Sequence, residues 1–228
     1  NDLNTTWMIL PSTYTLAAPP GVPASAFSNV FLTSFTVSWT ANNNPSYTSF
    51  YIELSTMSTF SPTTATWTWR LFVSTGADFA GLATGTTYYS RVKARNENLA
   101  DTYFVTLGST QTRLGVPVAL SPAITSVGTV SVAGAWSDPS NPTGTTYESW
   151  ISSNGYVNYF SSATALTNAT LTGLSTNTAY GLRVRALFAG LISDWTTLTA
   201  STYTLSAVPS SGDPTAVEIS SITANWLS

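Results

Sequence analysis

Three stretches of the chain place an apolar residue at every second position, and each of them leads to a tryptophan. Such alternation is typical of a β-strand that buries one face. We therefore predict a chain built from strands, in which Trp39 and Trp136 are buried at equivalent places in two similar units. The inward positions of the three stretches are predicted to be Phe35, Val37 and Trp39; Val130, Val132 and Trp136; and Ile222, Ala224 and Trp226.

The same features return with a fixed period along the chain. Val-Pro pairs begin at residues 22, 116 and 208, which are 94 and 92 residues apart. Asn-Pro pairs begin at Asn44 and Asn141, five residues after the first two of these tryptophans, in polar stretches typical of loops. A repeat of this length predicts a tandem array of similar domains.

A second group of features follows later in each repeat, again with identical spacing. A Gly-Leu pair precedes a tyrosine that stands six residues after the leucine, and a basic Arg-Val-x-Ala segment comes next. In the first repeat these are Leu82, Tyr88 and residues 91–94; in the second they are Leu174, Tyr180 and residues 183–186.

Both complete repeats resemble the fibronectin type III family, and in particular the tandem repeats of bacterial-type secreted or cell-surface proteins. The resemblance rests on the tryptophan of the second strand, the leucine-to-tyrosine corner and the Arg-Val-x-Ala segment. It covers nearly the whole chain. It implies an all-β fold of tandem immunoglobulin-like sandwiches, each with seven strands in two sheets.

The domain boundaries follow from a segment that occurs three times. Residues 12–16 (STYTL) recur as residues 201–205, and STQT at 109–112 takes the corresponding place between them. We interpret this segment as the last strand of a repeat. The chain is then divided into the last strand of a preceding repeat (1–20), complete repeats at 21–114 and 115–206, and the first two strands of a following repeat (207–228).

Composition narrows the range of functions. The chain has no histidine and no cysteine, which removes the commonest general base, the thiol nucleophile and most transition-metal ligands. Its ten acidic residues form no calcium-loop motif, so neither an enzymatic role, a cofactor nor a metal is expected. Charged residues make up 7% and the net charge is −3, which disfavours nucleic acid as a partner. No apolar run is long enough to span a membrane.

Five of the seven basic residues lie on the two Arg-Val-x-Ala strands, where alternation turns them outward. Tyr51, Glu53, Glu148 and Trp150 are the expected neighbours on adjacent strands. Two interpretations remain open: a row of cation-π and carboxylate contacts within each domain, or a partner-binding face. The candidate interface residues are Trp67, Trp69, Trp150, Arg91, Lys93, Arg183, Arg185, Ile222 and Trp226, and the acceptor motifs for N-glycosylation begin at Asn4 and Asn168.

The sequence favours a non-catalytic structural repeat outside a microbial cell, in a surface protein, filament, sheath or adhesin. Low charge, abundant Ser and Thr and the absence of cysteine support an extracellular or cell-surface location. The expected partners are neighbouring repeats or copies of the chain arranged head to tail, with glycans as a second class. The alternatives are a spacer or carbohydrate-binding accessory module of a secreted polysaccharide-degrading enzyme and a receptor ectodomain.

Overall fold

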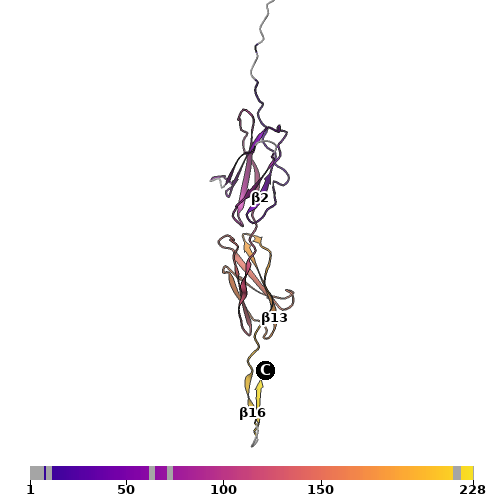
Figure 1. The fold of residues 1–228 in the computed structure, drawn as a ribbon, viewed down its shortest axis with the longest axis vertical. Helices are drawn as coiled ribbons and strands as arrows, with labels where there is room; N and C mark the ends of the chain where they lie inside the picture. The colour runs from indigo at the N-terminus through magenta and orange to yellow at the C-terminus, as the bar shows by residue number, and fades with distance from the viewer. Residues whose placement is uncertain (1–7, 9–11, 62–64, 71–73, 218–221, 228) are drawn as a thin grey trace, which may run out of the picture. The chain divides into compact units, whose positions relative to one another are not determined.

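The structure is a computed structural model that describes the chain except for residues 1–7, 9–11, 62–64, 71–73, 218–221 and 228. The chain divides into two compact units, residues 1–113 (unit 1) and 114–228 (unit 2). The described part contains strands and no helix (Figure 1). No helix in this part is therefore long and apolar enough to cross a membrane. The prediction of an all-β fold is confirmed.

Unit 1 is built from two antiparallel sheets. One sheet has the order β1-β2-β5 and the other has the order β4-β3-β6-β7. The strands are β1 (Phe27–Ser28), β2 (Ser34–Ser38), β3 (Ser49–Ser55), β4 (Ala65–Arg70), β5 (Gly76–Ala80), β6 (Thr87–Arg95) and β7 (Val105–Gln111).

Unit 2 repeats this arrangement. Its smaller sheet has the order β12-β9-β8, and its larger sheet has the order β11-β10-β13-β14, with β15 also paired to β13. A separate hairpin of β16 and β17 follows (Figure 1). The strands are β8 (Val118–Val127), β9 (Ser131–Ser137), β10 (Thr146–Ser152), β11 (Phe160–Thr164), β12 (Asn168–Thr172), β13 (Ala179–Phe188), β14 (Leu191–Ile192), β15 (Thr196–Tyr203), β16 (Ser210–Val217) and β17 (Ile222–Leu227).

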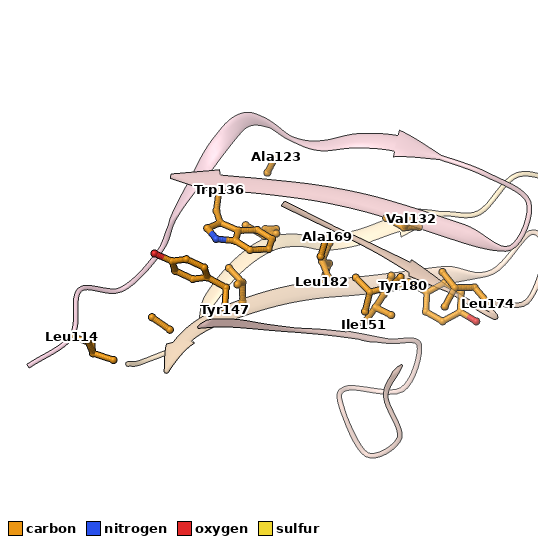
Figure 2. Close-up of a cluster of buried hydrophobic side chains, with 14 residues drawn as sticks. Leu114, Ala123, Val132, Trp136, Tyr147, Ile151, Ala169, Leu174, Tyr180 and Leu182 are labelled. Atoms are coloured by element: carbon orange, nitrogen blue, oxygen red, sulfur yellow. The ribbon is translucent and has the colours of Figure 1, made fainter. Parts of the chain in front are cut away.

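Each unit has its own hydrophobic core around the tryptophan predicted from the alternating pattern. Trp39 is 2% exposed in unit 1 and Trp136 is 1% exposed in unit 2, as expected. Figure 2 shows Trp136 beside Tyr147, and their ring centroids are 5.7 Å apart. Burial of several such aromatic side chains, each worth about 1.5–3 kcal/mol, stabilises a sandwich of this size.

The tyrosine of the repeated corner closes the loop before it in both units. The backbone N–H of Ala83 donates to the Tyr88 hydroxyl at 3.0 Å, and that of Ser175 donates to the Tyr180 hydroxyl at 3.0 Å. This shared contact explains why the six-residue spacing is the same in both repeats, because the tyrosine must reach back to a fixed backbone position.

Two inward positions of the alternating pattern, Val130 and Ala224, were predicted wrongly, since both are exposed. Val130 is exposed, because a turn closed by the hydrogen bond from Gly128 N–H to the Ser131 carbonyl delays the start of β9. Further along β9, Gly134 takes an inward place, and a Cβ there would lie 2.7 Å from Cδ2 of Leu182. The core of unit 2 therefore requires a residue without a side chain at position 134, where Leu182 fills the space.

The backbone that enters each unit is held by the asparagine of the Asn-Pro pair. Asn44 Oδ1 accepts from Ala18 N–H at 2.8 Å, while Asn44 Nδ2 donates to the Ala18 carbonyl at 2.7 Å. Asn141 makes the same two bonds with Gly115, at 2.7 and 3.0 Å. We call each of these pairs of bonds an entry clamp. Its recurrence shows that the residues just before the first strand belong to the packed structure of the unit.

The entry segments differ in what surrounds them. Leu114 is 4% exposed and belongs to the core of unit 2. Residues 12–20 form no strand, and Thr15 and Ala18 bond instead to Asn96 and Asn44 of unit 1. Assignment of residues 1–20 to a preceding repeat stays a prediction, as do the boundaries at 114 and 206.

Candidate binding face

The basic strands β6 and β13 carry their cations on the outer face of the larger sheet in each unit. Buried and half-buried residues alternate along β6, as the sequence predicted. Tyr51 pairs with Lys93 and Glu53 with Arg91, and in unit 2 Glu148 pairs with Arg185 and Trp150 with Arg183. All four neighbours expected from the sequence are therefore confirmed by the strand register.

In unit 1 the first cation of this face has an acidic partner. Arg91 forms an ion pair with Glu53 at 2.6 Å. Its guanidinium carbon lies 4.3 Å from the ring centroid of Phe60 and 4.1 Å from that of Phe104. The charge of Arg91 is thus balanced by a carboxylate, and its apolar faces are covered by rings.

The other two cations of this face in unit 1, Lys93 and Arg95, share one carboxylate. Asp101 accepts from Lys93 at 2.6 Å and from Arg95 at 2.5 Å. The hydrogen bond from Arg95, helped by the one from Lys93, lowers the pKa of Asp101 to about 2. Lys93 also lies 5.0 Å from the ring of Phe104. This part of the face is an internal network of charges.

In unit 2 the corresponding row contains two large indole rings. Arg185 pairs with Glu148 at 2.7 Å and lies 4.4 Å from the ring centroid of Trp195. Arg183 lies 3.8 Å from the ring of Tyr156, 4.2 Å from that of Trp195 and 4.8 Å from that of Trp150. We call Arg183 and these three rings the Arg183 cage.

Two hydrogen-bond donors of the Arg183 cage have no acceptor among the described residues. Both Arg183 Nε and Trp150 Nε1 are buried and have no partner there, and Arg183 forms no ion pair with any described carboxylate. Tyr159 stacks on Trp150 with centroids 3.7 Å apart and an angle of 10° between the planes. Burial raises the pKa of Tyr156, and the charge of Arg183 opposes this shift.

For the remaining candidate interface residues, the structure describes the strands on which they lie but not their side chains. Trp67 and Trp69 lie on β4, and Ile222 and Trp226 lie on β17, but their side chains are outside the described part. Ala224, between the latter two, is exposed. Their role as interface residues stays a prediction.

Of the two asparagines in glycosylation motifs, the structure describes only Asn168. Asn4 lies outside the described residues. Asn168 is exposed on β12, opposite Ala135 of β9, so no large side chain of that strand covers it. Modification at either asparagine stays a prediction.

Sequence reasoning missed several residues that complete the basic faces. Tyr156 and Trp195 of the Arg183 cage lie on loops beside β11 and β15, and Asp101 lies in the loop after β6. None of them belongs to an alternating strand. The one available signal was that Trp195 had no core position assigned to it.

The acidic groups near these faces pair with cations of the same unit. Among the residues that the structure describes, no three His, Cys, Asp or Glu side chains group together in a way that could hold a metal ion. Glu53 and Asp101 each form an ion pair with a basic side chain, Glu53 with Arg91 and Asp101 with Lys93. The geometry of these faces therefore fits contacts and binding.

Comparison with known proteins defines the fold. Residues 18–103 match the family model described as fibronectin type III domain. A two-domain fibronectin type III segment of chicken tenascin superposes with a TM-score of 0.61 at 15% identity, covering 82% of this chain and all of that one. The fold is that of tandem fibronectin type III domains.

Two further structures match less well. The chicken interferon gamma receptor alpha chain gives a TM-score of 0.49 at 12% identity, covering 83% of this chain and 99% of that one. The FN1–FN3 domains of chicken CNTN1 give 0.36 at 17% identity, covering 92% and 76%. No curated protein matches the sequence. The family match of residues 18–103 and the tenascin superposition confirm the fibronectin type III resemblance at the level of fold.

Proposed function

We propose that this chain is a non-catalytic structural segment of a microbial surface protein, filament, sheath or adhesin, located outside the cell. Fibronectin type III domains are modules that serve many tasks on one scaffold, so the fold alone does not assign the task. The assignment draws on how the chain uses its few charged groups.

The observation that carries the proposal is the recurrence of one set of internal contacts in both units. The tyrosine corner, the entry clamp and the outward basic strand occur twice. Arg91, Lys93, Arg95 and Arg185 each bind a carboxylate of their own unit. A chain that uses most of these charges for contacts inside each of two similar modules suits a repeated structural role.

The surface location can be tested on cells of the source organism. Antibodies raised against residues 1–228 should label intact cells, and external protease should remove the label without lysis. The expected result follows from a composition with no cysteine and few charges. Labelling that appears only after the cells are broken would contradict the proposal.

A second role is favoured by exposed aromatic side chains on unit 2. Tyr159 and Phe160 are 45% and 47% exposed. Exposed rings of this kind can stack on sugars, which supports a spacer or carbohydrate-binding module attached to a polysaccharide-degrading enzyme. A hydrolase domain in the full-length protein would favour this alternative, whereas further repeats would favour the structural role.

A further inference from the structure

The two units differ at both cross-strand positions of the basic face, and one of these differences leaves a cation without an acidic partner among the described residues. Glu53 faces Arg91 in unit 1, and Trp150 faces Arg183 in unit 2. The first pair forms an ion pair at 2.6 Å, whereas the substitution of an indole for the carboxylate leaves Arg183 without an acidic partner among the described residues. The same place in the repeat thus holds a balanced charge in one unit and an unbalanced charge in the other.

Arg183 is nevertheless enclosed as a buried cation would be. Three aromatic rings lie within 5 Å of its guanidinium carbon. Rings cover the flat faces of a guanidinium group, but its N–H bonds lie in the plane and need acceptors. Arg183 Nε and Trp150 Nε1 are two adjacent buried donors with no described acceptor. Arg183 as a whole is half-buried and its guanidinium group pairs with no described carboxylate, so the accessible Nη end of that group is suited to receive an acceptor from a ligand.

The groups around the Arg183 cage indicate which chemical groups the ligand has besides the acceptor. Tyr159 covers Trp150 with one face and is 45% exposed, which leaves ring surface for stacking. On the Tyr156 side, a hollow of about 170 Å³ is lined by Ser153 and Ser201, both exposed, and by Gly181. Gly181 leaves room for the Tyr156 hydroxyl, which lies 3.3 Å from the place a Cβ would occupy.

We propose that the Arg183 cage is a binding site for a carboxylated saccharide, such as a chain of uronic acids. The carboxylate accepts hydrogen bonds from the guanidinium group of Arg183, which is the strong, charge-assisted kind of contact. A sugar ring stacks on the exposed face of Tyr159, and sugar hydroxyls bond to Ser153 and Ser201. A saccharide fits better than an acidic peptide because the site combines the cation with a stacking ring and a hydroxyl-lined hollow.

This site goes beyond the structural role, because the module would bind an acidic polysaccharide in addition to linking its neighbours. Unit 1 provides the contrast within the same chain. Arg91 already has Glu53 as its carboxylate, so unit 1 is not expected to bind the ligand at its basic face. Loss of saccharide binding would leave the surface location and the repeat architecture untouched, so the two proposals fail separately.

The test is titration of the full chain with the trimer of galacturonic acid, followed by calorimetry and by the NMR signal of Arg183 Nε–H. The acidic trimer should bind and shift this signal, while the neutral trimer of galactose should bind at least about tenfold more weakly. Arg183→Gln should weaken binding at least about tenfold, because it removes a hydrogen bond to a charged group. Arg113→Gln, which removes an exposed cation elsewhere, is the matched control and should leave binding unchanged.

A second variant keeps the proposal open to refutation if Arg183→Gln unfolds. Trp150→Glu copies the arrangement of unit 1 and supplies Arg183 with an internal carboxylate, so it should abolish binding of the acidic trimer while unit 2 stays folded. Equal binding of the acidic and neutral trimers would overturn the proposal. So would binding of a triglutamate peptide in place of the saccharide, or binding that survives both variants.

Discussion

Because of the entry clamp, we expect removal of the Asn141 side chain to lower the free energy of unfolding of unit 2 by a measurable amount. Asn141→Ala removes two hydrogen bonds to the backbone of Gly115, at 2.7 and 3.0 Å, both in a partly buried place. Each such bond contributes about 0.5–1.5 kcal/mol net, so the expected loss is about 1–3 kcal/mol. For a domain of this size, 1 kcal/mol corresponds to a shift of about 4–8 °C in the midpoint of thermal unfolding.

The assay is differential scanning calorimetry of the full chain, in which each unit contributes its own transition. Asn141→Ala should lower the transition of unit 2 and leave that of unit 1 unchanged, because both bonds lie within unit 2. Asn44→Ala should lower the transition of unit 1 instead, through the loss of its two bonds to Ala18 and of a third to the Ala41 carbonyl. Asn141→Asp keeps one acceptor but places a negative charge beside the Gly115 carbonyl, and should be at least as destabilising as alanine. A change below about 0.5 kcal/mol in all three variants would show that the clamp does not stabilise the unit.

Three further predictions concern stability. Leu114→Ala should cost unit 2 about 2–5 kcal/mol in urea unfolding, because Leu114 is 4% exposed in that core; a loss in unit 1 instead would refute this assignment. Gly134→Ala should cost about 1–3 kcal/mol, because the added Cβ meets Leu182 at 2.7 Å; an unchanged urea midpoint would contradict it. The pKa of Asp101, lowered to about 2, means that its ion pairs stabilise unit 1 above the ordinary carboxyl pKa of about 4 and lose this effect as the pH falls toward 2. The Asp101→Asn variant should therefore be less stable than the wild type at pH 6, by about 1 kcal/mol or less since the site is exposed, and equally stable near pH 1.5.

The alternation of apolar and polar residues correctly predicted which side chains of the basic strands face outward and which neighbours they meet. Alternation placed Arg91 and Arg183 on the outer face, and the repeated order of strands placed Glu53 and Trp150 beside them, as the register shows. The same reasoning predicted burial of Trp136 correctly. These features follow from a period of two and from pairing between neighbouring strands, which the residues themselves encode.

Other features depend on the paths of loops, which have no period. Tyr156 and Trp195 reach Arg183 from segments between strands, so their contacts could not be read from spacing. Val130 was misplaced because a turn at residues 128–131 interrupts the apparent strand. The entry clamp was missed because an asparagine in a polar loop was interpreted as turn chemistry alone, although its amide can pair with a distant backbone.

Whether the chain consists of repeated structural modules can be measured directly by stretching a single molecule of residues 1–228 between two surfaces. We expect two separate unfolding steps, one for each unit. Each step should release about 300 Å of chain, since about 90 residues extend to roughly 3.3–3.6 Å each. Asn141→Ala should lower the force of one step only. Smooth extension without steps, or a single step for the whole chain, would contradict the account.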